Sequence, residues 1–102
     1  MTVTVRFALE AERTLDAIEA RWNGEHGLLR ENPLLAEVSR TAERLRANPE
    51  LGVIHRRPRR DSLAVRRLLL STGWHLYYTY DPTQAHVMVI AISYARRGKP
   101  PL

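Results

Sequence analysis

The sequence contains no cysteine among its 102 residues. Without thiols the chain cannot build a disulfide framework, bind zinc through thiolates or use a cysteine nucleophile, although Ser or His chemistry stays open. It also lacks a long apolar run, because its clearest one, residues 87–92, is far too short to cross a bilayer. The first residues lack the apolar core of a secretory signal peptide. We therefore expect a cytoplasmic protein with no membrane partner.

The patterns of several catalytic and metal-binding sites are missing as well. The four His residues are scattered, and no pair has the spacing of a metal site on one element, so we expect no metal. There is no glycine-rich phosphate loop and no nucleophile elbow, and we expect no cofactor. Only Asp61 and Asp81 supply carboxylates after residue 51. A hydrolase that uses paired carboxylates is therefore disfavoured.

Positive charge is concentrated in the second half of the chain. The formal net charge is +5. Residues 1–51 carry seven Arg against nine acidic residues, a balance of −2, whereas residues 52–102 carry eight Arg and one Lys against two acidic residues, a balance of +7. This asymmetry indicates an anionic partner for the second half. Arginines that only keep an exposed face soluble are the alternative.

The hydrophobic patterns predict a single domain, residues 1–102, of the α+β class. Apolar and polar residues alternate over residues 2–7, which predicts a strand. Apolar residues at helical spacing predict two helices, one from about residue 8 and one that begins at Asn32-Pro33. Three strands over residues 64–70, 74–80 and 87–92 then form a meander. We expect an antiparallel sheet with the helical hairpin packed on one face, in the order β-α-α-β-β-β. Residues 53–63 are predicted to be a basic surface loop.

Tyrosines and arginines are mixed in the second half, which is a combination that can stack on bases and contact phosphates. Tyr78 and Tyr80 share a strand face with Leu76, so at least one of them is expected in the core. Tyr94 and the cations after it follow the most buried strand, where it leaves the core. The candidates for binding a target are Arg66, Arg67, Tyr94, Arg96, Arg97 and Lys99.

The order of these elements, together with several short motifs, resembles the RelE/ParE superfamily of bacterial type II toxins over nearly the whole chain. The motifs are Asn32-Pro33, Pro49-Glu50-Leu51-Gly52, Val65-Arg66-Arg67-Leu68, Leu76-Tyr77-Tyr78 and Tyr94-Ala95-Arg96-Arg97. The resemblance implies a toxin encoded beside a cognate antitoxin that wraps and neutralises it in a hetero-oligomer. It also implies growth arrest and, for the ParE-like branch, plasmid stabilisation.

The superfamily has two branches with different chemistry. RelE-like members cut messenger RNA on the ribosome. Their cations hold the phosphate, and a Tyr or His near the C-terminus moves protons. ParE-like members instead poison DNA gyrase. RelE-like toxins carry two Lys where this chain has Arg66 and Leu68. They carry a catalytic Arg where it has His75, and a terminal Tyr that it lacks.

The ending Tyr94-Ala95-Arg96-Arg97 instead is similar to the His-Gly-Arg-Arg ending of ParE-like toxins, with Tyr in place of His. We therefore interpret the chain as a ParE-like toxin that binds DNA gyrase and is not an enzyme. The alternative is a RelE-like, ribosome-dependent mRNA endoribonuclease with Arg66, His75 and Arg96 as catalytic residues. A toxin relic that only binds its antitoxin is a third interpretation.

Overall fold

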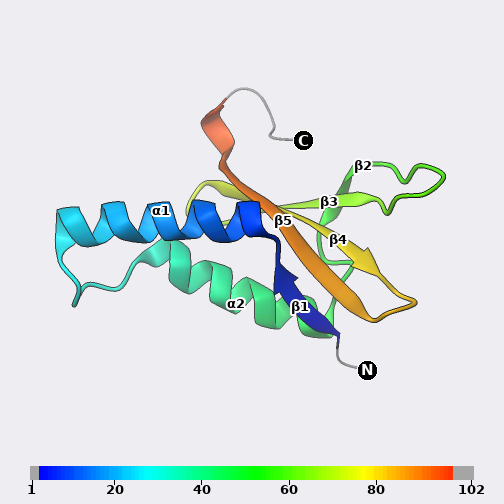
Figure 1. Ribbon diagram of the computed structural model, residues 1–102, viewed down its shortest axis with the longest axis horizontal. Helices are drawn as coiled ribbons and strands as arrows, with labels where there is room; N and C mark the ends of the chain where they lie inside the picture. The colour runs from blue at the N-terminus through cyan, green and yellow to red at the C-terminus, as the bar shows by residue number, and fades with distance from the viewer. Residues whose placement is uncertain (1–2, 98–102) are drawn as a thin grey trace.

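The computed structural model describes residues 3–97. Its elements in chain order are β1 (Thr4–Phe7), α1 (Leu9–His26), α2 (Pro33–Ala47), β2 (Val53–Arg56), β3 (Val65–Leu69), β4 (Trp74–Asp81), β5 (His86–Tyr94) and the 3-10 helix η1 (Ala95–Arg97). The two helices form a hairpin beside a five-stranded sheet, and α1 runs well beyond the sheet's edge (Figure 1). The predicted α+β class, with a helical hairpin followed by a three-stranded meander, is confirmed.

The strand order is β1-β5-β4-β3-β2. The meander β3–β4–β5 is antiparallel, but β1 pairs in parallel with β5, from Thr4 opposite His86 to Phe7 opposite Val89. The sheet is therefore mixed, and the expectation of a wholly antiparallel sheet was wrong for this one pair. Alternation identifies the residues that share a face of a strand, but it carries no information on the strand's direction.

The segment predicted as a basic loop, residues 53–63, starts with a fifth strand. β2 pairs antiparallel with β3 through Val53 opposite Arg67 and Ile54 opposite Arg66. Its two β-branched residues favour extended backbone, and pairing with β3 satisfies their backbone groups on one side. The Arg-rich residues 57–64 that follow form a connection with a single bridge, Arg59 to Ser62.

One face of the sheet and the inner faces of both helices form the core. Its buried members are Val3, Ala11, Leu34, Val38, Leu45, Leu70, Leu76, Tyr78, Val87, Val89 and Ile92. Leu15 and Ile18 of α1 pack against this cluster from its margin. Both helices cover one sheet face, and among residues 3–97 no helix covers the other, termed here the open face (Figure 1).

The start of α2 follows the predicted capping pattern. Oδ1 of Asn32 accepts hydrogen bonds from the backbone N–H groups of Leu34 (3.0 Å) and Leu35 (3.3 Å), and Pro33 occupies the first helical position. These are the N–H groups that a helix start leaves without an intrahelical partner. The cap fixes where α2 begins and so where its apolar stripe meets the sheet.

A carboxylate clamp attaches α2 to the turn between β3 and β4. One oxygen of Glu37 accepts from the backbone N–H (2.6 Å) and hydroxyl (2.7 Å) of Ser71, and the other accepts from the N–H (3.0 Å) and hydroxyl (2.7 Å) of Thr72. Partial burial opposes ionisation of Glu37, but these four hydrogen bonds outweigh it and lower its pKa to about 2. Gly73 completes the turn with φ 90°, a conformation that glycine adopts without strain.

Candidate functional site

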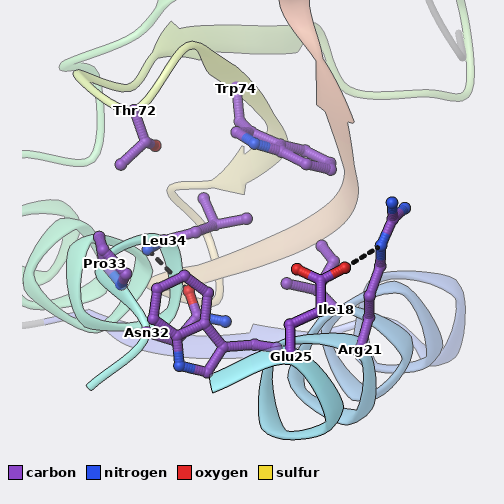
Figure 2. A pocket seen from close by; sticks show the side chains of 9 residues that line it. Ile18, Arg21, Glu25, Asn32, Pro33, Leu34, Thr72 and Trp74 are labelled. Carbon is purple, nitrogen blue, oxygen red and sulfur yellow. Dashed lines mark hydrogen bonds and ion pairs between the residues drawn. The ribbon is translucent and has the colours of Figure 1, made fainter. Parts of the chain in front are cut away.

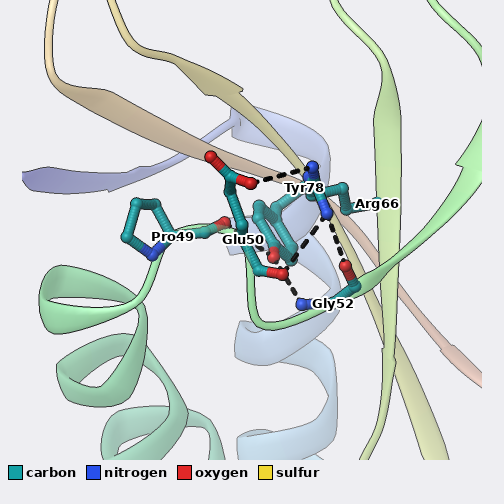
Figure 3. A network of polar contacts seen from close by, with 5 residues as sticks. All are labelled: Pro49, Glu50, Gly52, Arg66 and Tyr78. Carbon is teal, nitrogen blue, oxygen red and sulfur yellow. Dashed lines mark hydrogen bonds and ion pairs between the residues drawn. The ribbon is translucent and has the colours of Figure 1, made fainter.

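Arg66 and Arg67 are neighbours on β3, so their side chains lie on opposite faces of the sheet. The Arg66 guanidinium faces the segment between α2 and β2. It donates to the carbonyl oxygens of Gly52 (2.8 Å) and Glu50 (3.3 Å), and it lies 3.7 Å from the Glu50 carboxylate (Figure 3). Arg66 therefore holds a chain reversal in place, and its charge is already engaged within the protein.

Tyr78 completes this network from the core side (Figure 3). Its side chain is fully buried, and its hydroxyl donates to the carbonyl of Pro49 (2.8 Å) and accepts from the N–H of Gly52 (2.8 Å). Burial raises the pKa of the hydroxyl, so it stays protonated and able to donate. Gly52 fits here because it lacks a side chain: a Cβ on it would stand 2.9 Å from the Tyr78 ring and 2.9 Å from the Arg67 carbonyl oxygen.

Four side chains from three adjacent strands gather on the open face: His55 of β2, Arg67 of β3, and His75 and Tyr77 of β4. The ring centroids of His55 and Tyr77 are 5.0 Å apart with edge-on geometry, and those of His75 and Tyr77 are 5.9 Å apart. Arg67 is the register partner of Tyr77. Burial lowers the pKa of His75, and the positive charges of Arg67 and His55 lower it further. We call these four residues the His-Arg cluster.

The C-terminal candidates lie at the end of β5. Tyr94 is 40% exposed, and its ring stands 5.5 Å from the ring of Trp74. The N–H of Ala95 donates to the carbonyl of Gly73 (2.9 Å), which fixes the start of η1, and the side chain of Arg96 is exposed to solvent. Tyr94 and Arg96 are thus available to a partner at this end of the sheet.

The remaining C-terminal candidates are described only in part. Arg97 is the last residue of η1, and its backbone alone is described. Lys99 lies outside the described residues, 3–97.

The residues proposed for the nuclease alternative do not converge. Arg66 lies on the helix-covered side of β3, whereas His75 lies on the open face with Arg67. His75 instead packs against the Tyr77 ring, as His55 also does. Sequence reasoning did not select His55 because residues 53–63 were interpreted as a loop. The signal that could have found His55 was the pair of β-branched residues Val53 and Ile54, directly after Gly52.

A groove opens between α1, the start of α2 and the β3–β4 turn (Figure 2). Its volume is about 440 Å³, and it is lined by Ile18, Arg21, Trp22, Glu25, Asn32, Pro33, Leu34, Thr72 and Trp74. The Nε1–H of Trp22 donates to the carbonyl of Arg30 (3.0 Å), which holds the indole at the wall. Arg21 and Glu25 form an exposed ion pair at the rim (3.2 Å). The groove thus has an apolar floor and a polar rim, as a docking site for an amphipathic helix requires.

No protein-family model and no curated protein matches the sequence. Solved structures match over nearly its whole length. An archaeal RelE–RelB complex from Pyrococcus horikoshii OT3 has a TM-score of 0.66 at 10% identity, over 96% of this chain and 100% of that chain. A chromosomal ParDE system from P. aeruginosa has a TM-score of 0.67 at 16% identity, over 93% and 98%. The toxin–antitoxin complex RelBE2 from Mycobacterium tuberculosis has a TM-score of 0.61 at 23% identity, over 92% and 99%. The chain has the RelE/ParE toxin fold.

On this RelE/ParE fold the two candidate surfaces lie on different sides of the sheet. Trp74, which lines the groove, and His75, which belongs to the His-Arg cluster, are consecutive residues of β4 and so point to opposite faces. Within residues 3–97, neither helix is long and apolar enough to span a membrane. No group of three His, Asp or Glu side chains in that same range could hold a metal ion.

Proposed function

We propose that this protein is the toxin of a type II toxin–antitoxin pair, ParE-like in action, which arrests growth by binding DNA gyrase and is neutralised by a cognate antitoxin. The observation that carries the toxin assignment is the fold. Three structures named for toxin–antitoxin systems superpose on 92% or more of the chain, and they extend little beyond it. The chain therefore shares the architecture of these structures over nearly all of its described length, which supports the assignment.

The placement of Arg66 supports binding over cleavage. A ribonuclease site must hold the scissile phosphate and move protons at one point, and general acid or base action alone contributes about 10²- to 10⁴-fold. Arg66 is engaged with Glu50 and Gly52 on the face opposite His75, so these two residues do not form one site. Tyr94 and Arg96 remain exposed at the end of β5, where they can contact a protein target.

We further propose that the antitoxin occupies the groove with an apolar helix face and extends along the basic half of the molecule. The groove's apolar floor fits one large side chain, and the charge of +7 in residues 52–102 favours an acidic, partly disordered segment. Trp74→Ala should weaken antitoxin binding at least tenfold, because an aromatic side chain in such a pocket contributes about 2 kcal/mol or more. Co-purification with the product of the adjacent reading frame, followed by titration calorimetry, measures this. Binding that is unchanged by Trp74→Ala would place the antitoxin elsewhere.

Two pairs of variants test the target. Replacing Arg96 and Arg97 together by Ala should weaken growth arrest, whereas Arg40→Ala with Arg44→Ala, which removes the same charge from the exposed face of α2, should not. Purified wild-type protein should inhibit gyrase supercoiling, and induced cells should show DNA damage and filamentation before translation falls. Normal supercoiling in the presence of the protein would refute the gyrase proposal.

One observation favours the alternative, a ribosome-dependent mRNA endoribonuclease. His75 and His55 both contact the Tyr77 ring on the open face, close enough to Arg67 for its charge to affect His75, and such a group of side chains can move protons near a phosphate. If the protein is a nuclease, His75→Ala should abolish growth arrest while antitoxin binding persists, and messenger RNA should be cut at ribosome-positioned codons within minutes of induction. If it acts by binding gyrase, His75→Ala should leave growth arrest nearly unchanged.

A further inference from the structure

The link between α1 and α2, residues 27–32, exposes two leucines to solvent. Leu28 is 82% exposed and Leu29 is fully exposed, at the end of the helical hairpin that extends beyond the sheet (Figure 1). Links between helices are usually polar, because the hydrophobic effect favours the removal of apolar side chains from water. We call Leu28 and Leu29 the apolar tip. These two side chains gain free energy only when a partner covers them.

The apolar tip is held in place by contacts on both sides of it. Before the tip, the rings of Trp22 and His26 pack with their centroids 3.9 Å apart, and the N–H of Gly27 donates to the carbonyl of Asn23 (2.9 Å). After the tip, the carbonyl of Arg30 accepts from the Trp22 indole (3.0 Å). The chain therefore turns back over the indole. A tip that is already ordered loses little conformational entropy when it binds.

The groove between the helices and the β3–β4 turn begins next to this tip. Two of its lining residues, Glu25 and Asn32, are four and three positions from Leu29 in the chain. Its walls include the apolar side chains of Ile18 and Leu34, and its volume of about 440 Å³ is enough to enclose a small apolar group (Figure 2). One end of the molecule thus carries both an apolar projection and an apolar hollow. A twofold interface presents the same surface from both copies, so it requires both features together.

The charges at this end also suit a second copy of the chain. Residues 18–34 carry two Arg against three Glu, a balance of −1, whereas residues 52–102 carry +7. The link (cyan) and the arginine-rich β2–β3 connection (green) lie at opposite ends of the molecule's long axis, which extends over 45 Å (Figure 1). Two copies that meet at their hairpin ends therefore keep their basic ends much farther apart than the screening length of about 8 Å at physiological salt. A strongly acidic partner would gain attraction at the basic half and not at this end.

We propose that the free chain forms a weak twofold dimer in which Leu29 of each copy inserts into the groove of the other. An interface of this small size gives a dissociation constant on the order of 10 µM or weaker. The dimer does not depend on the proposed function, because it involves this chain alone. If an antitoxin occupies the same groove, as proposed above, the dimer and the toxin–antitoxin complex exclude each other. The second copy then shields the groove whenever the antitoxin is absent.

The chain's own tryptophans report on the groove. It has two, Trp22 and Trp74, and both line the groove. Sedimentation of the full chain from about 1 to 300 µM should show the mass rise from 11.8 kDa towards twice that value, and Trp emission should shift to shorter wavelength over the same range. Added salt should not weaken the dimer, because it screens the repulsion between two copies of net charge +5. A chain that stays monomeric would overturn the proposal and leave the tip to another partner. A dimer without the emission shift would also overturn it, because its interface would lie outside the groove.

Variants separate this interface from general association of apolar surfaces. Leu29→Gln should weaken the dimer at least tenfold and remove the emission shift, and it should leave the fold intact because Leu29 is fully exposed. Leu9→Gln is the matched control, because Leu9 is also an exposed leucine (60%) but stands at the start of α1, far from the tip. Thermal melting checks that both variants are folded. Equal losses of dimer in the two variants, or an unchanged dimer in Leu29→Gln, would refute the proposal.

Discussion

The buried hydroxyl of Tyr78 allows the sharpest test of how the fold is held together. Tyr78→Phe keeps the ring in the core but removes the donor to the Pro49 carbonyl and the acceptor for the Gly52 N–H. A buried polar group without a partner costs about 1 to 3 kcal/mol. The Gly52 N–H is buried and the Pro49 carbonyl only partly so. We therefore expect the variant to lose about 2 to 3 kcal/mol of unfolding free energy.

Urea unfolding and thermal melting measure this loss. One kcal/mol corresponds to about 4 to 8 °C for a domain of this size, so a loss of about 2 to 3 kcal/mol should lower the melting temperature by about 8 to 24 °C. Tyr80→Phe is the control, because Tyr80 is on the same strand and packs against the same core, and its hydroxyl has no hydrogen-bond partner among residues 3–97. It should change stability by less than about 0.5 kcal/mol. Equal losses in the two variants would show that the Tyr78 hydroxyl does not hold the α2–β2 segment.

Three further predictions concern stability. Glu37 has a lowered pKa in the folded state. Its contribution to the free energy of unfolding is therefore complete above about pH 4.5 and is lost as the pH falls towards 2. Because solvent screens part of the interaction that lowers this pKa, Glu37→Gln should lower the free energy of unfolding by about 1 to 2 kcal/mol at pH 7 and by almost nothing near pH 2. Thermal melting at both pH values measures the difference. Gly52→Ala should cost about 1 to 3 kcal/mol in urea unfolding, because the new Cβ would overlap the Tyr78 ring; full stability would contradict that close approach. Leu45→Ala should cost about 2 to 5 kcal/mol, since Leu45 is fully buried, and an unchanged melting temperature would contradict the placement of α2.

The parts of the fold that depend on local signals could be predicted from the sequence. Asn32-Pro33 marks the start of α2 because capping depends on residues only two or three positions apart. Val38 and Leu45 of α2 lie in one core cluster with Val89 of β5, as helical spacing and strand character would place them on the buried faces.

The parts that depend on distant partners could not be predicted. The direction of β1 is set by β5, some eighty residues later in the chain. Arg66 was selected as a target-binding cation because nothing in the local pattern separates an exposed arginine from one bonded to the carbonyl of Gly52. His55 was overlooked for a similar reason. Its neighbours His75 and Tyr77 come from β4, and only the pairing of β2 with β3 brings them together.

The interior position of β5 in the sheet bears on when the fold can be completed. Among residues 3–97, β5 is the last strand to be synthesised, yet it lies between β1 and β4 and pairs with both. While the nascent chain grows, β1 and β4 each have one side without its final partner, and the helical hairpin has no complete sheet to cover. A chain whose translation stops before residue 86 lacks the strand that joins its two halves. A protein with this topology can therefore complete its sheet only after β5 has left the ribosome.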